Sequence, residues 1–337
     1  MWPRMRAAKG VHRQRHGGLT LPSPPCRSLA SRSAGTRRRK GASMAVIGVN
    51  AGAEWPDALA RAARDLPPGA PILVMLHGYR YSPARPAHDP HRHILSPLDR
   101  PGHVSWPRGL GFDGSPGEGL AIGFGWEARG RLRHAYDRAE GAGVAVARLM
   151  DRLAQAGGRP VGLIGHSLGG RVALQALAHA GAGTAGRVVL LNAAEFQDRA
   201  QAALDAPGAQ GAEVLNVTAR ENDPFDFALE QLLSRGRSRA LGAGLAQRRA
   251  NWVDLQIDDP ATLDGLADLG FPTARGARLM SHWTPYLRQG LFPFYRAALC
   301  HPWALPLGLL RHHLPVSGQP RWSRLLPGPA VLAGLRA

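Results

Sequence analysis

The stretch Val161-Gly162-Leu163-Ile164-Gly165-His166-Ser167-Leu168-Gly169-Gly170 decides the fold. Residues 161–164 form an apolar run bounded by turn residues, which is typical of a strand buried on both faces. A glycine follows directly, and residues 172–180 then show the helical spacing of apolar side chains. A buried strand that passes through a tight turn into a helix indicates one unit of a parallel sheet.

The same alternation of strand and helix continues on both sides of this stretch. We expect further strands at residues 44–49, 72–76, 120–126, 187–193, 213–218 and 251–257. We expect helices at residues 55–66, 131–156, 195–204, 225–233, 260–269 and 283–299. The predicted fold class is therefore α/β, with a mostly parallel central sheet and helices on both faces.

Three segments organise the predicted chain. Residues 44–299 form the α/β domain, and residues 80–118 within it are a long Pro-, Gly- and His-rich insertion that we expect to form a pocket wall or lid. Residues 300–337 are a Pro- and Arg-rich C-terminal tail. Residues 1–43 are basic, acid-free and aperiodic, which indicates disorder, a targeting peptide or a wrongly assigned start. We favour translation from Met44, because Lys40-Gly41-Ala42 can be encoded by a purine run similar to a bacterial ribosome-binding site.

The net charge of +18 does not indicate a nucleic-acid partner once its distribution is considered. Residues 1–43 hold eleven Lys and Arg, which leaves +7 for the other 294 residues. Beyond Met44 every Lys or Arg position is arginine, as expected of a GC-rich bacterial genome, whereas nucleic-acid surfaces usually mix both types. We therefore expect no nucleic-acid partner.

The lengths of the apolar runs and the number of cysteines indicate the cellular location of the protein. No run approaches 18 uninterrupted apolar residues, so we expect no stable membrane insertion. Cys26 and Cys300 are too few for a disulfide framework, which fits a reducing, cytoplasmic location.

The motif Gly165-His166-Ser167-Leu168-Gly169 matches G-x-S-x-G between a strand and a helix, the context that a nucleophile elbow requires. Such a turn lifts the Oγ of Ser167 above the sheet, and side chains at Gly165 or Gly169 would collide there. The turn also directs the N–H of Leu168 toward an oxyanion. Ser167 is the predicted nucleophile.

A second feature lies at the end of the strand at residues 72–76. His77-Gly78 occupies the position where a second oxyanion donor belongs, and we expect the N–H of Tyr79 to be that donor. By itself His77-Gly78 is equally consistent with an ordinary turn after a strand.

A strand followed by His-Gly, and a later strand followed by Gly-His-Ser-Leu-Gly-Gly, resembles the α/β-hydrolase superfamily of esterases and lipases over residues 71–299. Phe124-Gly125-Trp126 with Tyr136-Asp137 is similar to an uncharacterised bacterial group of α/β-hydrolases. The resemblance implies the order serine, acid, histidine. It places the acid three to five residues after the strand at 213–218, and Asp223 is the best candidate. Asp226, slightly further along the chain, and Glu221 are alternatives.

The roles of Asp223 and of the histidine depend on this order. Asp223-Pro224 is also a good helix start, so a capping role for Asp223 stays open. Of the histidines after Asp223, three lie in the Pro-rich tail, and His282 is the predicted base.

These residues predict a serine hydrolase that cleaves an ester or thioester of a small-molecule acyl substrate through an acyl-enzyme. An acyltransferase or amidase on the same triad, and a catalytically silent binding protein, remain alternatives. We expect no cofactor and no metal. A solvated loop is the favoured interpretation of His88, Asp89, His91 and His93, against a metal site.

Overall fold

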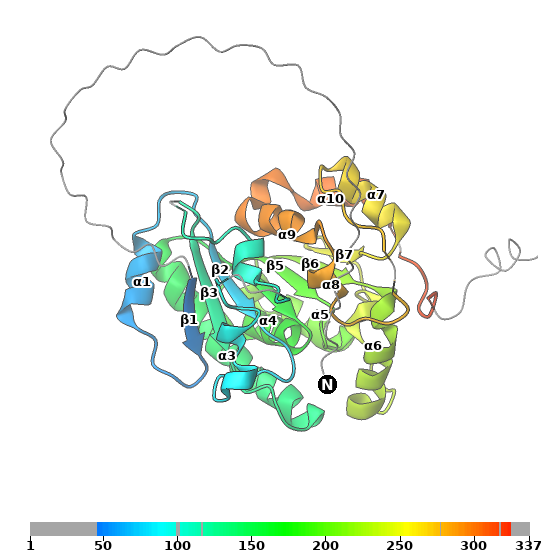
Figure 1. Cartoon of the computed structure of the whole chain (residues 1–337), viewed down its shortest axis with the longest axis horizontal. Coiled ribbons are helices and arrows are strands. Elements are labelled where there is room, and N and C mark those ends of the chain that lie inside the picture. Colours follow the sequence, from blue (N-terminus) through cyan, green and yellow to red (C-terminus); the bar gives the residue numbers. More distant parts are fainter. Residues whose placement is uncertain (1–45, 99–101, 116, 277, 317, 325–337) are drawn as a thin grey trace, which may run out of the picture. The chain divides into compact units, whose positions relative to one another are not determined.

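The computed structural model describes residues 46–98, 102–115, 117–276, 278–316 and 318–324 (Figure 1). The segment 1–43, with its alternative interpretations, lies outside the described residues.

A single sheet of seven parallel strands forms the centre of the domain. Its order is β1-β3-β2-β4-β5-β6-β7, so β1 and β7 are the edges (Figure 1). The strands are β1 Val46–Asn50, β2 Ile72–Leu76, β3 Leu120–Gly125, β4 Val161–His166, β5 Ala185–Leu191, β6 Glu213–Thr218 and β7 Trp252–Gln256. The predicted α/β fold class with a parallel sheet is confirmed.

Helices connect the strands and cover the sheet on both faces, as predicted. They are α1 Asp57–Arg64, α2 Trp106–Gly109, α3 Leu132–Gly157, α4 Leu168–His179, α5 Gln197–Asp205, α6 Asp223–Leu229, α7 Pro260–Asp268, α8 Thr284–Leu287, α9 Leu291–Cys300 and α10 Leu307–His313. A π-helical turn, Glu230–Ser234, extends α6.

The face covered by α2, α7, α9 and α10 includes segments without strong sequence periodicity. The insertion at residues 80–118 contributes the buried residues Ile94, Leu95, Trp106, Leu110 and Phe112. It is thus built into the core of this face.

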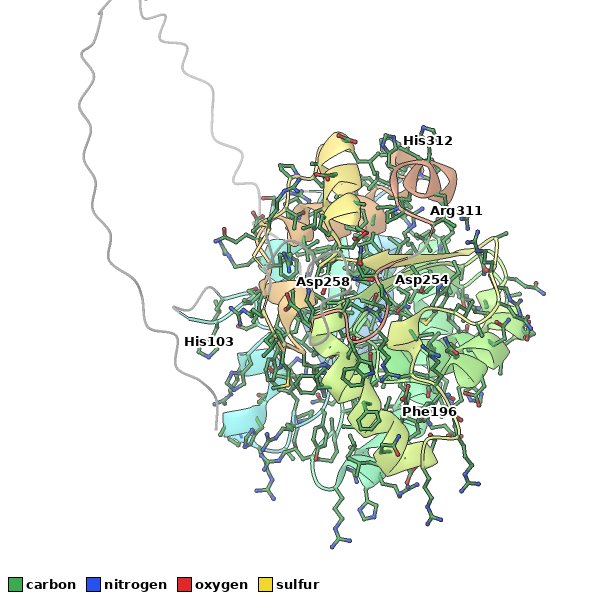
Figure 2. All side chains as sticks on the ribbon, turned by 90° about the vertical axis from the view of Figure 1, so that its right-hand side faces the viewer. His103, Phe196, Asp254, Asp258, Arg311 and His312 are labelled. Atoms are coloured by element: carbon green, nitrogen blue, oxygen red, sulfur yellow. The ribbon has the colours of Figure 1, made fainter. Side chains whose placement is uncertain are left out.

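The C-terminal residues differ from the expected tail. Leu307 and Leu310 of α10 are buried in the same core. Arg311 donates hydrogen bonds to the carbonyl oxygens of Ala250 and Trp252 beside the β7 edge (Figure 2). The folded domain therefore extends past residue 300. The leucines of this segment are irregularly spaced, so the sequence pattern alone does not indicate that they are buried.

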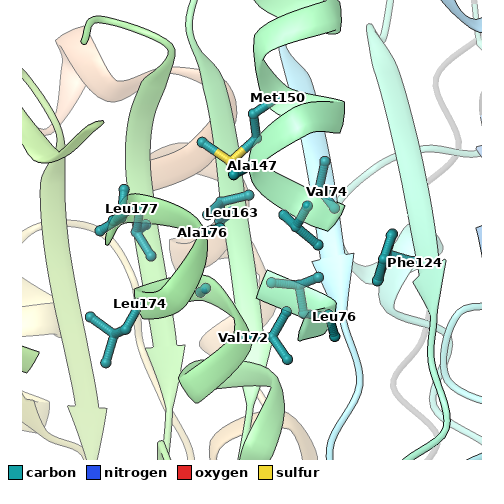
Figure 3. Close-up of a cluster of buried hydrophobic side chains, with 14 of the residues drawn as sticks. Val74, Leu76, Phe124, Ala147, Met150, Leu163, Val172, Leu174, Ala176 and Leu177 are labelled. Atoms are coloured by element: carbon teal, nitrogen blue, oxygen red, sulfur yellow. The ribbon is translucent and has the colours of Figure 1, made fainter. Parts of the chain in front are cut away.

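The opposite face is covered by α1, α3, α4 and α5. Alternate residues of each strand point to the two faces, so Val74 and Leu76 of β2 meet α3 and α4 (Figure 3) while Leu73 and Met75 belong to the other core. Burial on both faces explains why β2 and β4 are continuous apolar runs.

The strand order brings the ends of β2 and β4 together. Register pairs Leu76 with Gly165, so His77-Gly78 continues beside His166-Ser167. The chain leaves β2 toward β3 on one side and leaves β4 toward β5 on the other. In open parallel sheets ligands bind at the carboxyl ends of strands where the connections diverge in this way.

Candidate active site

Ser167 lies between the last residue of β4 and the first residue of α4, with φ 56° and ψ −124°. A positive φ is strained for any residue other than glycine. The turn is tight enough that a Cβ at Gly165 would overlap the carbonyl oxygen of Gly169, and a Cβ at Gly169 would overlap that of Leu76. The local geometry is thus the strand–turn–helix arrangement that the sequence predicts, with the serine at its tip.

Within the described ranges, two backbone N–H groups next to this turn have no recorded acceptor. A Cβ at Gly78 would lie 2.8 Å from the Cβ of Ser167, so the chain after β2 touches the turn. The N–H of Leu168 is the first of α4 and has no acceptor inside the helix. Among the described residues, no acceptor binds the N–H of Tyr79. Both N–H groups therefore remain available for the predicted oxyanion role.

His77 has a structural position beneath these groups. Its Nδ1 donates to the carbonyl oxygen of Gly78 at 3.0 Å, and its Nε2 accepts from the N–H of Trp126 at 3.0 Å. The two rings stack at 5.5 Å. Burial lowers the pKa of His77 to about 3, so the ring stays neutral and connects the ends of β2 and β3.

His282 is attached to the serine turn through its backbone. The carbonyl oxygen of His282 accepts from Nε2 of His166 at 2.9 Å and from Nδ2 of Asn192 at 3.1 Å. His166 directly precedes Ser167, and Asn192 follows β5. Two donors from neighbouring strand ends thus fix a residue that lies more than a hundred positions away from Ser167.

The ring of His282 is held by a side-chain amide. Its Nδ1 lies 2.6 Å from Oδ1 of Asn222, and its face stacks on Phe225 at 4.9 Å. Because an amide oxygen only accepts, Nδ1 carries the proton and Nε2 is free to receive one. Burial lowers the pKa of His282 well below its usual value, and His166 lowers it further.

Asp223 does not contact this histidine. Its carboxylate accepts from the N–H of Trp322 at 2.6 Å and pairs with Arg220 at 3.3 Å. The contact that we expected from Asp223 is made by the preceding residue, Asn222, because the single 3₁₀ turn before α6 directs that side chain toward His282. This geometry corrects the expected partner of the histidine.

The two alternative carboxylates have other neighbours. Glu221 is fully buried, accepts from the N–H of Arg278 at 2.9 Å and pairs with Arg288 at 3.2 Å. Asp226 accepts from Nδ2 of Asn222 at 3.0 Å. Both therefore support the region around His282 without touching its ring.

The serine and the histidine are neighbours without a direct bond. The rings of His166 and His282 lie 4.5 Å apart, yet in the described residues Oγ of Ser167 makes no hydrogen bond to His282. Such contacts are often long in the absence of substrate and tighten when it binds.

The histidines of the insertion support the sheet edge. Nε2 of His91 lies 2.9 Å from Oδ1 of Asn50, Asp89 accepts from the N–H of His91, and Nε2 of His93 lies 3.2 Å from the carbonyl oxygen of Ala87. Among the residues that the structure describes, no group of three or more His, Cys, Asp or Glu is placed to hold a metal ion.

Sequence reasoning missed two residues of this site. Asn222 lies one position before the predicted acid, and only the direction of the backbone turn distinguishes the two. Asn192 follows the apolar run of β5 and adopts a positive φ of 42°, which an Asn at a strand end tolerates better than most residues. A polar residue that ends a buried strand was the available signal.

No protein-family model matches the sequence, and no curated protein matches it. Among solved structures, a lipase of Bacillus licheniformis in its mature form is similar to 57% of this chain and 84% of its own, with 14% identity and a TM-score of 0.34. Within the described part of the chain, no helix has the length and apolar character needed to cross a membrane.

Proposed function

We propose that the protein is a serine hydrolase that cleaves carboxylic esters or thioesters of small-molecule substrates through an acyl-enzyme on Ser167. The observation that carries the proposal is the attachment of His282 to the serine turn by His166 and Asn192, with its Nδ1 on Asn222. A half-buried histidine with its Nε2 unprotonated, on a loop bonded to the turn of a strained serine at a switch point of the sheet, suits nucleophilic catalysis.

The reaction uses these groups in sequence. Oγ of Ser167 attacks the carbonyl carbon as Nε2 of His282 takes the hydroxyl proton. The N–H groups of Leu168 and Tyr79 stabilise the oxyanion, each by about 3 kcal/mol. His282 then gives the proton to the leaving oxygen or sulfur. It next takes a proton from the water that attacks the acyl-enzyme, and it returns this proton to Oγ of Ser167 as the Oγ–acyl bond breaks and the acid leaves.

Labelling with a fluorophosphonate probe tests this function. The wild-type protein is expected to be labelled. Ser167→Ala is expected to abolish labelling, because Ser167 is the serine that His282 activates. Ser115→Ala, at an exposed loop position, is the matched control and should label fully. Labelling that persists in Ser167→Ala would exclude Ser167 as the nucleophile, and an unlabelled wild-type protein would favour a silent binding protein.

A chain-length series of p-nitrophenyl esters, with and without added alcohols, thiols or amides, then identifies the bond and the acceptor. Preferred transfer to an added alcohol would replace the hydrolase proposal with an acyltransferase, and turnover of amides alone would replace it with an amidase.

A further inference from the structure

Two buried side chains, Asn222 and Asp226, continue the hydrogen bonding of His282, so that the three residues form a line. Nδ1 of His282 lies 2.6 Å from Oδ1 of Asn222, and Nδ2 of Asn222 donates to Oδ1 of Asp226 at 3.0 Å. Asn222 and Asp226 are 1% and 5% exposed, so water does not compete for these bonds. The two residues are four positions apart at the start of α6, which places their side chains on one face.

The chemistry of the line permits only one arrangement. An ionised carboxylate only accepts hydrogen bonds, so the amide of Asn222 must present its NH₂ group to Asp226 and its oxygen to His282. The oxygen in turn requires the proton of the imidazole on Nδ1. We propose that Asp226 is a positioning residue that fixes, through the amide of Asn222, the tautomer and orientation of His282; this rests on the function proposed above.

The charged groups around Asp226 decide when this constraint operates. Burial raises the pKa of Asp226 to about 7, Arg220 and Arg321 oppose the rise, and Asp223 adds to it. Protonated Asp226 can donate as well as accept, so the amide of Asn222 is then free to turn. The constraint on His282 is therefore present above about pH 7 and is lost as the pH falls.

Asp226→Asn tests the proposal with little change in shape. An Asn at position 226 can present either its oxygen or its NH₂ group, so the amide of Asn222 takes both orientations. The expected loss in kcat is about 10- to 100-fold, as for other residues that orient a catalytic group. In the wild type, kcat/KM should decrease as the pH falls below about 7, where Asp226 becomes protonated. The variant should not show this decrease near pH 7, because its remaining titrating group, His282, has a pKa well below its usual value.

An exchange of the two side chains provides the rescue. In the double variant Asn222→Asp with Asp226→Asn, the carboxylate accepts from Nδ1 of His282 and from the new amide. The double variant should therefore recover most of the kcat that Asp226→Asn loses. A residue needed only for packing would not be rescued in this way.

The matched control is a second Asn–Asp bond, in which the Asn is buried and the Asp is exposed. Nδ2 of Asn216 donates to Oδ1 of Asp254 at 2.7 Å on the neighbouring strands β6 and β7, and neither residue bonds to His282 or Asn222. Asp254→Asn removes the same kind of contact and should change neither kcat nor its pH profile.

A ¹⁵N spectrum of the histidine side chains, with His282 assigned by its loss in His282→Gln, reads the tautomer without turnover. We expect Nδ1–H alone in the wild type at about pH 8 and a mixture in Asp226→Asn. An unchanged tautomer together with unchanged kcat in Asp226→Asn overturns the proposal. If the wild type neither hydrolyses esters nor binds the probe, the proposed function fails, while the tautomer comparison still decides the role of Asp226.

Discussion

At the scale of single residues, the unusual feature is an amide where a carboxylate was expected behind His282. An amide oxygen orients the imidazole and fixes its tautomer, but it carries no charge to stabilise the imidazolium that forms when Ser167 reacts. Burial lowers the pKa of His282, and the neutral amide of Asn222 does not offset this effect. The contribution of Asn222 is therefore to orient the ring and not to stabilise its charge.

We predict that Asn222→Ala lowers kcat about 100-fold with little change in KM, because the amide acts on the base and not on substrate binding. Asp223→Asn breaks the pair with Arg220, and its main expected effect is a lower Tm. Steady-state kinetics with thermal unfolding of both variants separates the two roles. A large loss of kcat in folded Asp223→Asn, with Asn222→Ala active, would restore Asp223 as the partner of the histidine.

The sequence could predict the surroundings of Ser167 because glycine spacing, an apolar strand and a following helix are local signals. It could also place the polar partner in the loop after β6. It could not choose among four polar residues there, since the directions of Glu221 and Asn222 depend on a 3₁₀ turn and those of Asp223 and Asp226 on the helix α6 that follows. The direction of the 3₁₀ turn depends on Asp258, which accepts from the N–H of Arg220 at 3.0 Å and lies far along the chain.

At the scale of elements, the loop that carries His282 is fixed by Glu221. Beyond its contacts with Arg278 and Arg288, this carboxylate accepts from Oγ1 of Thr284, and its backbone oxygen accepts from the N–H of Ser281 at 2.8 Å. These partners lie on both sides of His282. Glu221 therefore holds the loop, while Asn222 holds the ring.

Glu221→Gln should loosen this loop. It leaves the buried Arg288 without a counter-charge, so the free energy of unfolding should fall by about 3 kcal/mol. Amide hydrogen exchange across residues 278–288 should accelerate, and kcat should fall with it. Adding Arg288→Met removes the unpaired charge and should recover part of the stability. Unchanged exchange in folded Glu221→Gln would exclude Glu221 as the residue that holds the loop.

Elements with a clear period were predictable to within a few residues, and those without one were not. β2 and β6 match their predicted ranges, and in β2 burial on both faces leaves a continuous apolar run. α10 and the insertion at residues 80–118 bury leucine and aromatic side chains at irregular spacing, which only tertiary contacts with α9 explain.

At the scale of the whole domain, residues near the C-terminus support the site from outside the sheet. The N–H of Trp322 binds Asp223, Arg321 pairs with Glu230 at 2.9 Å, and Arg324 pairs with Asp258 at 3.0 Å. These contacts converge on the loop after β6 and on α6. The domain thus concentrates buried ionisable groups at the carboxyl ends of its central strands, and its stability depends on pH for that reason.

Three histidines make the domain less stable as the pH falls. Burial lowers the pKa of His77 to about 3 and that of His166 to about 4, and it lowers the pKa of His282 as well. Below about pH 6.5 the unfolded chain binds protons that the folded domain excludes, so stability falls as the pH falls, by about 1.4 kcal/mol per pH unit for each histidine. Asp226, Asp223 and Asp254 oppose this trend, because burial raises the pKa of each carboxyl group and the folded state therefore binds a proton before the unfolded chain does.

His77→Gln tests the contribution of one of these histidines to the pH dependence of stability. The variant is expected to be less stable at every pH because it loses the stacking on Trp126. Between about pH 4.5 and pH 6, however, the slope of its unfolding free energy against pH should be smaller by the equivalent of about one proton. His312→Gln, at an exposed position of α10, is the control and should keep the wild-type slope (Figure 2). The measurement is urea unfolding across this range. A His77→Gln slope equal to that of the wild type would mean that His77 accepts a proton in the folded domain, which is incompatible with its acceptor bond from Trp126.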